Sequence, residues 1–195
     1  LSVTNLDVNL TAYSSQPFIV TLPGNIALNP KQDFATSPDP YSLAVKDLDG
    51  DGKPDLAVSN SGNNTVSVFR NTSSSGTVSF ATKVDFATGT GPRSITIGDI
   101  DGDGKADLAV TNLSSNTVSV FRNTSTSGTV SFATKIDFTT GISPFSISIG
   151  DIDQDGKPDL AVANAGANTV SVLRSTSASG TISFASKVDF ATGNS

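Results

Sequence analysis

The sequence predicts an all-β protein, and three observations support this prediction. The chain has 195 residues with 18 acidic residues, all of them aspartate, so the strong helix former glutamate is missing. Val, Ile, Thr and Phe lie between clusters of Gly, Asn and Ser, a pattern typical of short strands joined by turns. Finally, the chain repeats itself every 52 residues, as the spacing of Asp47, Asp99 and Asp151 shows.

The repeat divides the chain into units. Residues 76–127 and 128–179 are nearly identical, residues 24–75 are a more diverged copy, and a partial fourth copy covers 180–195. Residues 1–23 fit the repeat worst. This leading segment is either a partial blade from an earlier unit or the end of a preceding domain.

Four strands are expected in each unit, because apolar and polar residues alternate with the period of a half-buried strand. These segments are 94–99, 107–112 and 116–122 in the unit 76–127, and 129–138 at the start of the unit 128–179. The last segment alternates over ten residues and predicts one long strand, with Val130, Phe132, Thr134, Ile136 and Phe138 on one face.

Four strands in about 50 residues is the size of one β-propeller blade. A blade buries its faces only against neighbouring blades, so the units are expected to stack side by side. Propellers usually close with about four to eight blades. Three complete blades therefore belong to a larger ring, or a second copy of the chain completes the ring; a compact four-bladed ring is a third option.

Each unit carries the pattern D-x-D-x-D-G-x-x-D between its first and second strands. Carboxylates at positions 1, 3, 5 and 9 and the carbonyl at position 7 could surround one Ca²⁺ ion, which takes six to eight oxygen ligands. The predicted metal ligands are Asp47, Asp49, Asp51, Lys53 and Asp55; Asp99, Asp101, Asp103, Lys105 and Asp107; and Asp151, Asp153, Asp155, Lys157 and Asp159. Gln154 replaces glycine at position 4 of the third loop, where the side chain is expected to point outward.

Calcium is the favoured ion at these three sites. Magnesium prefers six-coordinate geometry with retained water, and zinc prefers Cys or His, which the chain lacks. Other interpretations are a solvated acidic turn and a pair of hydrolase carboxylates, but three equal sites favour a structural role and no enzymatic activity. An EF-hand would need Glu at position 12, where this chain has Val110 in the middle loop.

The segments "DxDGDGKxDLAV…NTVSVF" and "DFATGTGP" resemble the FG-GAP/VCBS repeat family over residues 24–195. These repeats form the blades of integrin-α-like propellers and of many bacterial secreted proteins. The Phe-Gly…Gly-Ala-Pro element of the family is only loosely kept, as Phe86-Ala87 and Gly91-Pro92. The resemblance implies a seven- or eight-bladed propeller with calcium in its hairpin loops, an extracellular setting, and adhesive or scaffolding roles.

Charge and composition narrow the choice of partners. The net charge of −6 and the pI of about 4.4 argue against nucleic-acid binding, and no apolar run is long enough for membrane insertion. We expect a secreted or cell-surface protein, bacterial in character, that binds a protein or glycan ligand and that can associate with itself to complete the ring. A carbohydrate-binding propeller and an accessory, non-catalytic domain of a larger secreted enzyme are the alternatives.

Other repeated residues predict structure rather than a site. Phe80, Phe132 and Phe184 are expected between blades. Each of the three lysines Lys83, Lys135 and Lys187 shares a strand face with the aspartate two residues later. Finally, Arg70, Arg122 and Arg174 are expected as solvated charges at strand ends, in preference to a ring that holds an anion.

Overall fold

The structure, a computed structural model, describes residues 31–193. The chain forms two compact units, Leu1–Phe34 and Ala35–Ser195, and the second unit carries the fold described here. The predicted leading segment, residues 1–23, lies outside the described residues, and so does the start of the first predicted repeat.

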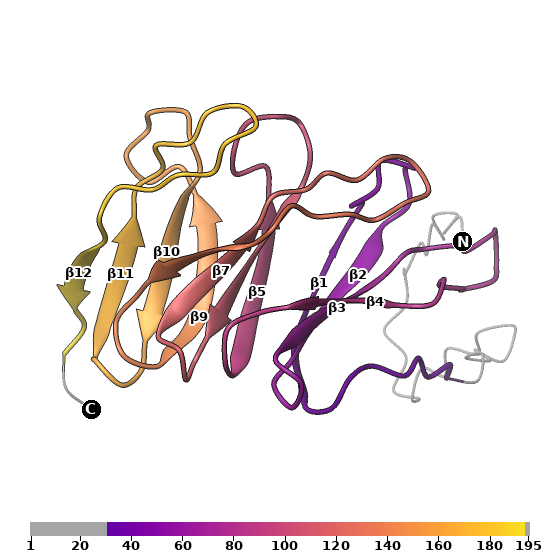
Figure 1. The fold of residues 1–195 in the computed structure, drawn as a ribbon, viewed down its shortest axis with the longest axis horizontal. Coiled ribbons are helices and arrows are strands. Elements are labelled where there is room, and N and C mark those ends of the chain that lie inside the picture. The colour runs from indigo at the N-terminus through magenta and orange to yellow at the C-terminus, as the bar shows by residue number, and fades with distance from the viewer. Residues whose placement is uncertain (1–30, 194–195) are drawn as a thin grey trace, which may run out of the picture. The chain divides into compact units, whose positions relative to one another are not determined.

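Twelve strands and no helix make up the described residues, which confirms the all-β prediction (Figure 1). They form three four-stranded antiparallel sheets in which neighbours in sequence pair. Blade 1 contains β1 (Pro40–Lys46), β2 (Asp55–Asn60), β3 (Thr65–Phe69) and β4 (Val84–Ala87). Blade 2 contains β5 (Pro92–Gly98), β6 (Asp107–Asn112), β7 (Thr117–Phe121) and β8 (Ile136–Thr139). Blade 3 contains β9 (Pro144–Gly150), β10 (Asp159–Asn164), β11 (Thr169–Leu173) and β12 (Val188–Ala191).

Each sheet takes its last strand from the following sequence repeat. Counted from Gly76, for example, residues 76–127 supply β4 to blade 1 and the first three strands to blade 2. Consecutive repeats are therefore linked through hydrogen bonds as well as through packing.

The fourth strand is much shorter than the ten residues predicted for it. In blade 2 it covers only Ile136–Thr139, because the preceding residues turn back on the chain after β7. Bridges from Asn123 to Phe132 and from Thr126 to Thr129 make residues 123–132 a hairpin, named arm 2 here. The prediction that Ile136 is buried is wrong, since this residue opens an edge strand and is exposed.

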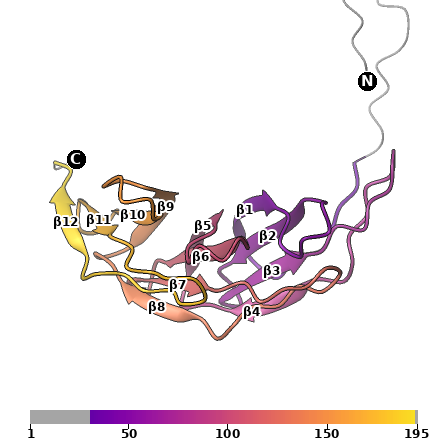
Figure 2. The same ribbon diagram turned by 90° about the horizontal axis from the view of Figure 1, so that it is seen from above.

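Apolar side chains pack between the blades, as the repeat architecture requires. One core cluster joins blades 1 and 2 through residues such as Val66 and Ile95, and another joins blades 2 and 3 through Val118 and Leu160. The first strands of the blades, β1, β5 and β9, are neighbours in this stack (Figure 2).

Two of the three phenylalanines predicted between blades, Phe132 and Phe184, contribute to the blade interfaces, whereas the ring of Phe80 meets that of Phe69 in its own blade. The rings of Phe86 and Phe132 meet edge to face with centroids 5.0 Å apart, and those of Phe138 and Phe184 meet at 4.9 Å. Edge-to-face pairs at this distance add to the stability gained from area burial alone.

Candidate metal centres

The three acidic loops connect the first and second strands of their blades: loop 1 is residues 47–55, loop 2 is 99–107 and loop 3 is 151–159. The glycine at position 6 is in the left-handed region in each loop, with φ of 86° at Gly52, 87° at Gly104 and 86° at Gly156. This conformation is costly for other residues and lets the loop turn tightly around its own centre.

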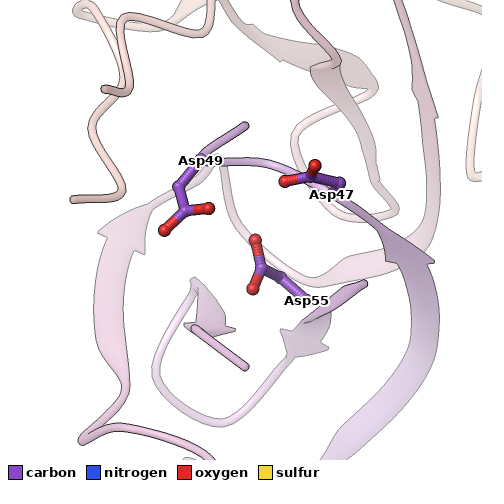
Figure 3. Close-up of side chains that lie close together, drawn as sticks. All are labelled: Asp47, Asp49 and Asp55. Carbon is purple, nitrogen blue, oxygen red and sulfur yellow. The ribbon is translucent and has the colours of Figure 1, made fainter. Parts of the chain in front are cut away.

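Carboxylates at positions 1, 3 and 9 gather in every loop. Asp47, Asp49 and Asp55 each offer an oxygen, and these oxygens lie within 4.8 Å of one another (Figure 3). The same holds for the triad Asp99, Asp101 and Asp107 and for the triad Asp151, Asp153 and Asp159. Two oxygens bound to one Ca²⁺ at about 2.3–2.6 Å can be at most about 5 Å apart. Each triad therefore fits a single ion.

The aspartate at position 9 is the deepest member of each triad. Asp107 is fully buried at the start of β6 and accepts hydrogen bonds from the backbone N–H groups of Ile100 and Asn123, at 2.9 and 2.7 Å. Asp55 and Asp159 make the equivalent pairs of bonds. Because each oxygen has a second lone pair, these carboxylates can fix the loop and still bind an ion.

The aspartate at position 3 of loop 2 gives the clearest indication that this loop can hold a cation. Asp101 is buried, and its Oδ1 accepts a bond from the N–H of Asp103, but its Oδ2 has no hydrogen-bond partner. A buried carboxylate oxygen without a partner is costly. A cation at the centre of loop 2 would satisfy it.

Positions 5 and 7 are not part of the close-packed triads. The carboxylates of Asp51, Asp103 and Asp155 accept bonds from the N–H of the lysine two residues later, at 2.8–2.9 Å. Their roles as metal ligands, and those of the Lys53, Lys105 and Lys157 carbonyls, stay predictions.

Burial and mutual repulsion disfavour the ionised forms of these carboxylates. Burial, reinforced by the charges of Asp101 and Asp103, raises the pKa of Asp107 to about 6 in spite of its two backbone hydrogen bonds. The pKa values of Asp55 and Asp101 are raised as well, chiefly by burial and then by neighbouring aspartates. Bound metal would reverse this effect, since a divalent ion favours the charged form.

The arm of the following blade covers the loop of the preceding one. In arm 2, the amide of Asn123 donates to the carbonyl of Leu48 at 2.8 Å, and the N–H of Gly128 donates to Oδ2 of Asp49 at 3.0 Å. Loop 1 is thus completed by residues about 75 positions away. Sequence reasoning missed these contacts, although the arms recur with the 52-residue period.

Cationic side chains also lie beside the loops. Arg122 is 4.0 Å from Asp103, and Arg174 lies 3.9 Å from Asp153 and 3.7 Å from Asp155. These arginines are at strand ends, as expected, but they face the acidic loops instead of solvent alone. The predicted lysine–aspartate pairs are also present, as Lys83–Asp85, Lys135–Asp137 and Lys187–Asp189.

A buried polar chain was not predicted from the sequence. The amide of Asn112 donates to the hydroxyl of Ser119, which donates to Asp137 across three strands, at 2.9 and 2.6 Å. Blades 1 and 3 have the same chain. It links the edge strand to the blade interior and is structural.

Comparison with known proteins supports the repeat assignment. The family model described as "FG-GAP-like repeat" matches residues 47–110 and 101–162, overlapping segments that each include two of the acidic loops or parts of them. No curated protein matches the chain.

Two solved structures show the same fold. A protein of unknown function from Desulfotomaculum acetoxidans is 25% identical, with a TM-score of 0.55 over 76% of this chain and 42% of its own. A proposed 6-phosphogluconolactonase from Bacteroides fragilis is 24% identical, with a TM-score of 0.53 over 78% of this chain and 40% of its own. The chain thus spans about two fifths of either structure. Separately, residues 31–193 contain no helix that is long and apolar enough to cross a membrane.

Proposed function

This chain belongs to the FG-GAP-like repeat family, and on that premise we propose that it is a calcium-binding β-propeller segment. Its metal ions are structural, and its role is adhesion, ligand binding or scaffolding outside the cell. No catalytic step is part of this proposal, because the three acidic loops are equivalent and each resembles a structural ion site more than a reaction centre.

The observation that carries the proposal is the triad repeated in three loops, with oxygens within 4.8 Å and, in loop 2, a buried oxygen left without a partner. All the side-chain ligands are carboxylates, the ligands of hard cations. Calcium tolerates the irregular geometry of a loop better than magnesium, which demands a near-ideal octahedron. Calcium at extracellular concentration would stabilise the folded state by mass action.

A thermal melt with and without metal tests this proposal. Chelation should lower the melting temperature, added Ca²⁺ should restore it, and Mg²⁺ at the same concentration should restore much less. Asp99→Asn is the informative variant, because Asp99 is exposed and belongs to one triad only. It should remove one bound ion of three in a calcium titration while the blade stays folded. Equal melting temperatures in chelator and in calcium would refute the assignment.

We further propose that more blades complete the ring. Leu43 of β1 is 64% exposed, whereas its counterpart Ile95, which faces blade 1 from β5, is 7% exposed. At the other end, Val188 and Phe190 of β12 are exposed, and in blade 2 the counterpart Phe138 packs against blade 3. The two open faces are the same two surfaces that meet at the internal interfaces.

The missing blades can come from further repeats of a longer chain or from a second copy. Molar mass in solution distinguishes these for the chain of 195 residues. A dimer is expected if a second copy closes the ring, and Phe190→Ser should then shift the equilibrium towards monomer. If the unsubstituted chain of 195 residues is monomeric at all concentrations, self-association is refuted and further repeats of a longer chain are favoured.

A further inference from the structure

One position of the repeat holds a different residue in each blade. It is Tyr41 in β1, Arg93 in β5 and Phe145 in β9, 52 residues apart, although the sequences around it are closely similar. The other three arginines of the chain all share a single repeat position, so Arg93 departs from the pattern.

A β-bulge aims these three side chains. Pairing with the second strand shifts between Pro40 and Ser42 in β1, and between Pro92 and Ile95 in β5. In β9, Pro144 and Ser146 face neighbouring residues of β10, so that Phe145 is the extra residue. A bulge redirects a side chain away from the regular alternation, and bulges are frequent next to functional sites.

The three side chains form a stack across the first strands of the blades, which are adjacent (Figure 2). The guanidinium carbon of Arg93 lies 3.9 Å from the ring centroid of Tyr41 and 4.6 Å from that of Phe145. Both are cation–π distances. The stack lines a shallow cavity of about 260 Å³, together with Ser42, Ser94 and Ser146.

The guanidinium of Arg93 has no hydrogen bond and no ion pair within residues 31–193. Arg122 and Arg174 differ, since both lie beside aspartates. The rings of Tyr41 and Phe145 pack against this group without using its N–H donors, which therefore stay available for a ligand. A fixed guanidinium edge matches a carboxylate, which it binds through two parallel hydrogen bonds.

We propose that this cavity binds an acidic sugar, with the carboxylate of a uronate on the edge of Arg93. The rings of Tyr41 and Phe145 are about half exposed and offer apolar surfaces to the C–H groups of a sugar ring. Three serines and the Tyr41 hydroxyl supply hydrogen-bonding groups for the sugar hydroxyls, which favours a sugar over an acidic peptide. The site is at the start of the first strands, whereas the acidic loops follow their ends. This inference names a ligand for the proposed binding role.

The test titrates the chain in calcium buffer with methyl glucuronoside, methyl glucoside and acetyl-glutamate, followed by NMR. The glucuronoside should bind at least tenfold more tightly than the other two. Arg93→Phe installs the residue that blade 3 carries at this position, and it should abolish that preference. Arg93→Lys keeps the charge but not the planar fork, and it should weaken binding in part. Lys187→Gln removes one positive charge from an exposed pair in blade 3, and it should leave binding unchanged.

Equal binding of the two sugars, or unchanged binding by Arg93→Phe, would overturn the inference. Acetyl-glutamate bound as tightly as the glucuronoside would overturn the choice of a sugar. Thermal melts of Arg93→Phe with and without chelator separate this inference from the proposed function. If the variant loses the preference for the glucuronoside but its melting temperature still falls in chelator, both proposals are supported. A normal glucuronoside preference with no chelator shift would refute the calcium proposal alone.

Discussion

Loops 2 and 3 have nearly the same sequence, but their surroundings differ. Ile100 of loop 2 is 1% exposed and packs with Leu160 and Ile182 of blade 3, whereas its counterpart Ile152 of loop 3 is 51% exposed. Asp101 is buried, and Asp153 is exposed. The difference arises because arm 3 (175–184) of the following blade packs beside loop 2, while no described blade follows loop 3.

A candidate metal centre in this fold is therefore shared between neighbouring blades. The loop supplies the carboxylates, and the next blade supplies the cover that desolvates them. Stability, proton affinity and ion affinity should therefore differ between two loops whose ligands are identical.

The largest effect is expected from truncating the apolar residue at position 2. Ile100→Ala should lower the free energy of unfolding by about 3 kcal/mol, since it leaves a cavity in the core between blades 2 and 3. Ile152→Ala should change it by less than about 0.5 kcal/mol, because that side chain is half exposed. Urea denaturation of the two variants measures both values. Equal losses would show that loop 3 is covered in solution, as it would be in an assembled ring.

The raised pKa of Asp107 predicts how the metal-free protein responds to pH. Its carboxyl titrates near pH 4 when unfolded but at about 6 when folded. Between these values the folded state binds more protons than the unfolded state, so the free energy of unfolding should fall as pH rises from about 4 to 6. Denaturation in chelator across this window measures the slope.

Calcium should reverse this trend, because binding requires the ionised carboxylate. Stabilisation by Ca²⁺ should therefore grow as pH rises through 6. Asp107→Asn serves as the control, since the amide cannot ionise and should flatten the slope in chelator. A metal-free protein that becomes more stable between pH 4 and 6 would contradict the assignment of the raised pKa.

Ion affinity should also differ between the loops. Arg174 lies beside both Asp153 and Asp155 in the open loop 3, whereas Arg122 in loop 2 lies beside Asp103 alone, so the arginine competes with an ion for more of the carboxylate charge in loop 3. We expect loop 3 to bind Ca²⁺ about tenfold more weakly than loop 2, a difference of about 1.4 kcal/mol. Arg174→Gln should strengthen binding at loop 3 while leaving the affinity of loop 2 unchanged. Calorimetric titration that finds three equal sites would refute this difference.

Much of this arrangement follows from the sequence alone. The 52-residue period and the alternation in segments such as 107–112 predicted the sheets, and the D-x-D-x-D-G-x-x-D spacing predicted that Asp99, Asp101 and Asp107 come together. These features are local, since the residues involved lie within one hairpin. Periodicity and turn chemistry are sufficient to predict features of this range.

Features that depend on the next blade could not be predicted in the same way. Asn123 contacts Leu48 across 75 positions. The second half of its hairpin arm, residues 129–132, was predicted as the start of a long strand, because a hairpin arm has the same alternation as a strand. The bulge that aims Arg93 leaves no mark in the apolar pattern. The repeat nevertheless contains a signal for this position. Tyr41, Arg93 and Phe145 occupy the same place in three similar repeats, so the fold does not require a particular residue there, and the position is a candidate for a binding role.

The smallest effect concerns position 4 of the loops. Gly50 and Gly102 have φ of 75° and 73°, and Gln154 has φ of 62°, so the side chain of Gln154 is exposed on a left-handed backbone. Such a conformation costs a non-glycine residue about 1 kcal/mol. Gln154→Gly should therefore raise the free energy of unfolding by somewhat less than this, because glycine also gains freedom in the unfolded chain.

The reciprocal variant Gly102→Gln should lower the free energy of unfolding by a similar amount, since no atom lies within 4 Å of the added Cβ and only the backbone conformation opposes the change. Thermal denaturation in calcium measures both variants, and a loss of stability in Gln154→Gly would show that the glutamine makes a compensating contact in loop 3.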